Sequence, residues 1–200
     1  MILYLHGLNS AGSSGKAAVL RQALHPIEVL SPTYPAHQAD QAVIWLSEML
    51  QDILADAPRS DRPLLLAGSS MGGFYGQYLA RRFPVGHLVM INPALRPWEL
   101  LSQVVGWQYN EALDERYYLS QDMVAATRRY GMQKVDDGVP TSLLLDQGDE
   151  LIDWRIASSI YSGVAEIHCF ADGSHAFEHM REAVVIIQRI HQALSLSSGS

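Results

Sequence analysis

Two kinds of segment alternate along this chain. Short apolar runs typical of buried strands are separated by longer stretches whose apolar positions recur at helical spacing. The short runs predict strands at 2–5, 27–30, 64–67, 87–91, 141–145 and 166–170. The longer stretches predict helices at 16–24, 38–55, 74–82, 154–161 and 176–194. Strands separated by helices predict an α/β fold, with a mainly parallel sheet of about six strands and helices on both faces.

Residues 94–139 interrupt this alternation. They contain no convincing buried strand, and they carry several tryptophans and tyrosines among leucines and valines. We expect a mainly helical, cap-like insertion between two strands of a single domain that spans 1–194. Ligands in open α/β sheets sit beyond the carboxyl ends of the strands, so an insertion here is placed to roof a site. The serine- and glycine-rich residues 195–200 are expected to form a flexible tail.

Composition narrows the class of protein. The chain has 200 residues, 48% of them hydrophobic and 18% charged, which indicates a globular fold with a real core. Its net charge of −7 argues against nucleic acid or an anionic membrane surface as a partner. The lone Cys169 excludes an intramolecular disulfide and suits a reducing, cytoplasmic compartment. The apolar run 1–5 is too short for a signal peptide or a membrane span. Nothing indicates the oligomeric state.

The strongest chemical signal is a G-x-S-x-G pattern made by Gly68, Ser70 and Gly72. It lies between the apolar run at 64–67 and the predicted helix at 74–82. A serine on a sharp strand-to-helix turn is held with its hydroxyl exposed, and the flanking glycines leave room for that turn. Ser70 is therefore the candidate nucleophile.

A serine hydroxyl needs a base to accept its proton, and the base needs a group that orients it. His175 is the candidate base because it follows the last predicted strand, on a loop at that strand's carboxyl end. Asp149, after the strand at 141–145, is the candidate acid. Asp146 and Asp153 compete for this role. Asp146 is close enough to the strand to point into the sheet edge, and Asp153 resembles the N-cap of the helix at 154–161.

Acyl transfer also requires backbone N–H groups aimed at the oxygen that becomes negatively charged. One is expected from Met71, the residue after the nucleophile, at the start of a helix where free amides point outward. The second is expected from the loop after the first strand, where we assign it to Leu8, with Asn9 as the alternative. His6 in the same loop is interpreted as a structural residue.

Four motifs carry these residues: Leu5-His6-Gly7-Leu8-Asn9-Ser10, Gly68-Ser69-Ser70-Met71-Gly72-Gly73, Gly148-Asp149-Glu150 and Gly173-Ser174-His175-Ala176-Phe177. Together they resemble the α/β-hydrolase superfamily, and more narrowly the small bacterial esterases of the YqiA type. The resemblance implies hydrolysis of carboxylic esters or thioesters of small to medium acyl groups through an acyl-enzyme, without metal or organic cofactor. Its implied partner is a small-molecule acyl ester or thioester.

The chain departs from the general hydrolase pattern in two ways. It starts directly at the strand that precedes the oxyanion loop, so the two leading antiparallel strands are absent. Its glycine and aspartate at 148 and 149 are also adjacent, whereas the general acid motif spaces them further apart.

Three other functions use parts of the same sequence. His175, Glu178 and His179 match H-x-x-E-H, a zinc-peptidase motif, although the chain offers only Glu182 nearby as a further ligand. Acyl transfer to an alcohol or thiol acceptor needs the same machinery as hydrolysis. Some hydrolase folds are binding proteins without catalysis.

Overall fold

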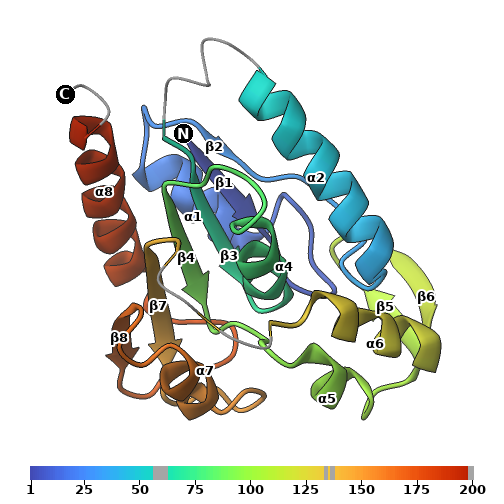
Figure 1. Cartoon of the computed structure of the whole chain (residues 1–200). Coiled ribbons are helices and arrows are strands. Elements are labelled where there is room, and N and C mark those ends of the chain that lie inside the picture. The colour runs from blue at the N-terminus through green and yellow to red at the C-terminus, as the bar shows by residue number, and fades with distance from the viewer. Residues whose placement is uncertain (56–62, 133–134, 136–137, 198–200) are drawn as a thin grey trace.

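The core of the molecule is a parallel six-stranded sheet, seen in a computed structural model that describes residues 1–55, 63–132, 135 and 138–197 (Figure 1). The strand order is β2-β1-β3-β4-β7-β8. The bounds are β1 Ile2–Leu5, β2 Val29–Leu30, β3 Leu65–Ser69, β4 His87–Ile91, β7 Thr141–Asp146 and β8 Glu166–Phe170. The predicted α/β class, parallel sheet and strand number are confirmed.

Helices cover both faces of this sheet. The main ones are α1 Gly15–Ala23, α2 Ala39–Ala55, α4 Met71–Leu79, α7 Trp154–Ile160 and α8 Met180–Ser197. Helices α1 and α8 pack on one face, and α2, α4 and α7 pack on the other (Figure 1). Among the described residues, no helix is long and apolar enough to cross a membrane.

Strand β1 shows why the sheet is covered on both sides. Ile2 and Tyr4 point into the core formed with α1 and α8, whereas Leu3 and Leu5 point into the core formed with α2 and α4. Successive side chains on a strand face opposite sides, so an uninterrupted apolar run must be buried on both. All four residues are at most 1% exposed.

The segment between β4 and β7 corrects one expectation. It was expected to be mainly helical, but it contains α5 Pro97–Leu101, an antiparallel hairpin of β5 Gly106–Asn110 and β6 Glu115–Leu119, then α6 Gln121–Thr127 and the 3₁₀ helix η1 Arg128–Tyr130. Trp107 pairs with Tyr118, and Tyr109 with Arg116. Aromatic side chains favour such cross-strand pairs, and these residues recur with period two. That spacing was the signal for strands.

Several element ends also differ from prediction. Helix α8 begins at Met180 and not at residue 176, so His179 lies before the helix. The same helix continues to Ser197, which leaves no tail at 195–197, and residues 198–200 lie outside the described part of the chain. Ends of helices are the least certain part of a sequence-based assignment because capping contacts decide them.

Candidate active site

Ser70 occupies a strained turn between β3 and α4. Its backbone angles are φ 54° and ψ −117°, a region that residues other than glycine rarely adopt. Two neighbours must be glycine for this turn to pack. A Cβ atom at Gly68 would collide with the carbonyl of Gly72, and one at Gly72 would collide with the carbonyl of Leu5 at the end of β1. The G-x-S-x-G pattern therefore serves close packing, with Ser70 partly exposed.

The loop after β1 lies directly beside Ser70. In the sheet register, Leu5 pairs with Gly68, so the ends of β1 and β3 are adjacent. A Cβ atom built on Gly7 would lie 3.2 Å from the Cβ of Ser70 and 3.7 Å from its Oγ. The same loop contains Leu8. Parallel neighbouring strands thus bring two motifs, more than sixty residues apart, to one edge of the sheet.

Ser70, His175 and Asp149 form a hydrogen-bonded chain. Nε2 of His175 is 3.1 Å from Oγ of Ser70. Nδ1 of His175 is 2.9 Å and 3.1 Å from the two carboxylate oxygens of Asp149. The carboxylate can only accept, so Nδ1 carries the proton and Nε2 faces the serine as an acceptor. The Asp149 side chain is 2% exposed and that of His175 is 20% exposed, so the hydrogen bond between them is largely shielded from water.

The loop after β7 holds the Asp149 carboxylate in place. Its Oδ1 accepts hydrogen bonds from the backbone N–H groups of Leu151 and Ile152, at 2.9 and 2.8 Å. Asp153, one of the two competing acids, is the N-cap of α7 and accepts from the N–H of Arg155. Its carboxylate is therefore committed elsewhere, and the structure brings Asp149 alone of the three candidates to His175.

Asp146, the other competing acid, is fully buried and pairs with His179. Its Oδ1 accepts from Nδ1 of His179 at 2.7 Å, and its Oδ2 accepts from the N–H groups of Glu178 and Ser174 at 2.8 and 3.3 Å. Gly173 is required beside it, because a Cβ there would collide with the carboxylate. Asp146 therefore anchors both ends of the loop that carries His175.

Asn92 completes this support, and sequence reasoning missed it. It has φ 40° at the end of β4, and its side-chain oxygen accepts the N–H of Asp146 at 2.9 Å. Its amide nitrogen donates to the carbonyl of Ser174 at 3.0 Å. The Asn92-Pro93 pair indicated only the end of a strand, although asparagine is among the residues that tolerate a positive φ.

The structure separates the residues of the H-x-x-E-H motif. His175 contacts Asp149 and Ser70, whereas His179 contacts Asp146. The backbone N–H of Glu178 donates to Asp146. Within the described ranges, no group of three histidine, cysteine, aspartate or glutamate side chains is arranged to hold a metal ion.

Met71 and Leu8, the expected amide donors, both line the cavity in front of Ser70. Met71 is the first residue of α4, where an N–H has no partner inside the helix. Asn9, the alternative to Leu8, has φ 52°, and its side-chain oxygen accepts a hydrogen bond from the hydroxyl of Tyr117 at 2.7 Å. The hairpin β5–β6 therefore contacts the loop that holds Leu8.

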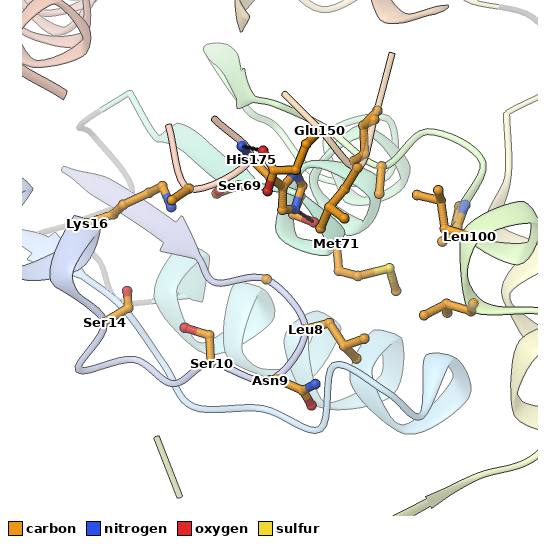
Figure 2. Close-up of a pocket in the computed structure, with 18 of the residues that line it drawn as sticks. Leu8, Asn9, Ser10, Ser14, Lys16, Ser69, Met71, Leu100, Glu150 and His175 are labelled. Carbon is orange, nitrogen blue, oxygen red and sulfur yellow. Dashed lines mark hydrogen bonds between the residues drawn. The ribbon is translucent and has the colours of Figure 1, made fainter. Parts of the chain in front are cut away.

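Ser70 and His175 open into a cavity of about 840 Å³. This is within the usual range for small-molecule sites. The apolar wall comes from helix α5 and its surroundings and includes Ala94, Pro97, Leu100, Leu101 and Val104. A polar wall lies opposite and includes Ser10, Ser14 and Lys16 (Figure 2).

Two charged side chains line this cavity. Burial lowers the pKa of Lys16, and the charge of Asp146 opposes that effect. The hydrogen bond from the N–H of His175 lowers the pKa of Glu150, whose Oε2 accepts it at 2.9 Å. The cavity thus combines a serine–histidine pair with an apolar wall and one ammonium group.

Comparison with solved structures identifies the fold. Est1E from Butyrivibrio proteoclasticus, bound to ferulic acid, aligns with a TM-score of 0.75 at 11% identity over 96% of this chain and 88% of its own. A monoacylglycerol lipase from Paleococcus ferrophilus aligns with a TM-score of 0.71 at 16% identity over 97% and 94%. Mouse α/β hydrolase domain-containing protein 10 aligns with a TM-score of 0.69 at 17% identity over 97% and 90%. At these identities the likeness establishes a shared fold.

A family model described as "Uncharacterised protein family (UPF0227)" matches residues 1–192, almost the whole chain. The strand order, the turn at Ser70 and the structural neighbours agree with the α/β-hydrolase resemblance seen in the sequence. The chain therefore belongs to the UPF0227 family and has the α/β-hydrolase fold.

Proposed function

We propose that this protein is a serine esterase or thioesterase that cleaves small to medium acyl groups through an acyl-enzyme. The observation that carries the proposal is the chain of hydrogen bonds from Ser70 through His175 to Asp149. A histidine within 3.1 Å of the serine hydroxyl can take its proton as the oxygen attacks a carbonyl carbon.

The proposed reaction has two halves. Oγ of Ser70 forms a bond to the carbonyl carbon while its proton moves to Nε2 of His175. The tetrahedral intermediate collapses when His175 returns that proton to the leaving oxygen or sulfur, which leaves Ser70 acylated. His175 then takes a proton from water, the hydroxide attacks the acyl carbon, and the acid is released as the proton returns to Ser70. Asp149 stabilises the imidazolium throughout.

The backbone amides of Leu8 and Met71 are proposed to stabilise the oxyanion. Both residues line the cavity beside Ser70, and a helix start directs N–H groups toward a developing negative charge. The insertion at 94–139 is proposed to roof the cavity, since Leu100, Leu101 and Val104 line its apolar wall. No cofactor enters this mechanism.

The activities in the names of structural neighbours support an ester as the substrate. The aligned proteins include one named a monoacylglycerol lipase and one named an esterase, from Pyrococcus furiosus. Acyl transfer would use the same Ser70 intermediate with another acceptor in place of water, so product analysis with an added alcohol or thiol separates it from hydrolysis. We propose a cytoplasmic location, on the basis of the single cysteine.

Labelling with a fluorophosphonate tests the proposal, combined with turnover of a panel of esters and acyl-CoA thioesters. Wild type should label at Ser70, and Ser70→Ala should lose labelling and at least about 10³-fold in turnover. Ser102→Ala is a matched control, because this exposed hydroxyl donates to the carbonyl of Glu99. Undiminished turnover by Ser70→Ala would contradict a serine hydrolase, and so would wild-type protein that neither labels nor hydrolyses any member.

A further inference from the structure

The cavity in front of Ser70 has an apolar end and a polar end. Leu8, Met71 and Leu100 lie toward one end, whereas Ser10, Ser14 and Lys16 lie toward the other, with His175 between the two groups (Figure 2). A linear substrate whose carbonyl carbon reaches Ser70 would therefore extend one arm over apolar side chains and the other toward Lys16. Two arms of different polarity are expected to be held at different ends.

The position of the Lys16 ammonium is electrostatically unfavourable. Its side chain is half-buried, and in the described part of the chain its ammonium has neither a hydrogen-bond nor an ion-pair partner. It also lies in the first turn of α1, two residues after the N-cap Ser14, where the helix dipole disfavours a cation. Burial of an ammonium that makes no hydrogen bond costs free energy, and a ligand that supplies an opposite charge would offset that cost.

The groups around Lys16 are suited to an anion. Ser10 offers a hydroxyl on the same wall. Ser14 lies beside it, but its Oγ already accepts the N–H of Ala17 and its side chain bonds to the Tyr4 hydroxyl. The carboxylate on the cavity wall, Glu150, accepts the N–H of His175 and forms no ion pair with Lys16. An ammonium with nearby hydroxyls binds carboxylate or phosphate oxygens through charge-assisted hydrogen bonds.

We propose that Lys16 is a specificity residue that binds a negatively charged carboxylate or phosphate on the leaving group of an ester or thioester. The apolar acyl arm lies along Leu100 and Val104, and the anionic alcohol or thiol arm reaches Lys16. This inference rests on the proposed function, because it places the scissile bond at Ser70. It adds a class of substrate that the nucleophile and base alone do not select.

A purely structural role for Lys16 makes a different prediction. Lys16 feels the charge of the buried Asp146, so it could serve only as a distant countercharge for that carboxylate. Removing a countercharge would lower stability and slow all substrates to the same extent. Removing a binding group would slow only the substrates that carry the anion.

Three butyryl esters separate these roles: those of 3-hydroxybenzoate, 3-hydroxybenzamide and 3-hydroxyphenyl phosphate. The first two match in size and differ in charge, and the third tests phosphate against carboxylate. We expect wild type to prefer an anionic ester to the amide by about tenfold or more in kcat/KM. Lys16→Met should remove this preference and leave the amide ester within about twofold of wild type, while Lys16→Arg keeps the preference. The preference should also weaken as ionic strength rises.

Controls make the outcome decisive. Arg116→Gln removes one positive charge from an exposed position on the hairpin and should change nothing. No anionic preference in wild type, or equal slowing of all three esters by Lys16→Met, overturns the role of Lys16. Ser70→Ala is measured beside them. Its inactivity with all esters retains the serine mechanism even if the Lys16 inference fails, whereas its full activity rejects the mechanism itself.

Discussion

The carboxylate of Asp146 accepts a hydrogen bond from Nδ1 of His179 at 2.7 Å, three and four residues along the chain from Asp149 and His175, which form a second such pair. Two aspartate–histidine pairs thus connect the carboxyl end of β7 to the segment that follows β8. The Asp149 pair reaches Ser70, and the Asp146 pair is anchored to backbone N–H groups. Neutralising Asp146 should therefore lower stability, whereas neutralising Asp149 should lower activity.

Asp146→Asn should mainly destabilise the fold. The buried carboxylate accepts three hydrogen bonds, and an amide can preserve only part of them while burying an extra N–H group. We expect a loss of about 2–4 kcal/mol in the free energy of unfolding, measured by urea titration. Asp153→Asn is the control, because asparagine caps a helix about as well as aspartate. Wild-type stability of Asp146→Asn would contradict the anchoring role.

Asp149→Asn should instead leave the fold intact and remove activity. The amide oxygen can still accept from the N–H groups of Leu151 and Ile152. The neutral amide, however, no longer places a negative charge beside Nδ1 of His175, so it does not stabilise the imidazolium. We expect kcat to fall about 10²- to 10⁴-fold, with circular dichroism and the unfolding midpoint close to wild type. If kcat changes little here and collapses in folded Asp146→Asn protein, the acid is Asp146.

Gly7→Ala should reduce turnover by crowding the nucleophile. The new Cβ would lie 3.2 Å from the Cβ of Ser70 and 3.4 Å from the carbonyl oxygen of Ser69, so the loop or the serine must shift. Small misplacements of reacting groups are costly, and we expect a loss of about tenfold to 10²-fold in kcat/KM for a neutral ester. Gly15→Ala is a matched control, since its Cβ meets nothing within 4 Å. Equal activity of the two variants would show that the loop tolerates the added methyl.

His87 should make the protein less stable in acid. Burial, the main cause, lowers its pKa to about 4, with smaller effects of Glu166 and Arg189, and its ring contacts the Ser142 hydroxyl at 2.9 Å. An unfolded histidine titrates near 6.5, so between pH 6.5 and about 4 the unfolded chain binds more protons. The stability contributed by neutral His87 is complete above pH 6.5 and is lost as the pH falls to about 4.

Urea unfolding of wild type and His87→Gln from pH 8 to pH 4 measures this contribution. The difference between them should shrink toward acid pH by at most about 3 kcal/mol, and by less because His87 is partly exposed. Buried His6, whose pKa is also lowered by burial, acts in both proteins and cancels in the difference. A difference independent of pH would show that His87 is not held neutral by the fold.

The sequence by itself determined the sheet and the identity of the reacting groups. Short continuous apolar runs such as 2–5 indicate strands buried on both faces, and glycines at 68 and 72 around Ser70 indicate a turn that excludes side chains. These are local signals, because backbone sterics and hydrophobic burial act on each segment. The order of the motifs was enough to name Ser70, Asp149 and His175, whose catalytic roles remain proposals.

Only the tertiary structure decided which side chains meet. Asp146, Asp149 and Asp153 lie within eight residues of one another, and their local sequence cannot tell which carboxylate reaches His175. The hairpin in the insertion, the support from Asn92 and the position of Lys16 in the cavity likewise depend on contacts between distant segments. The physical reason is that hydrogen bonds and charges act over a few ångströms in space, and the packing of strands and loops sets those distances.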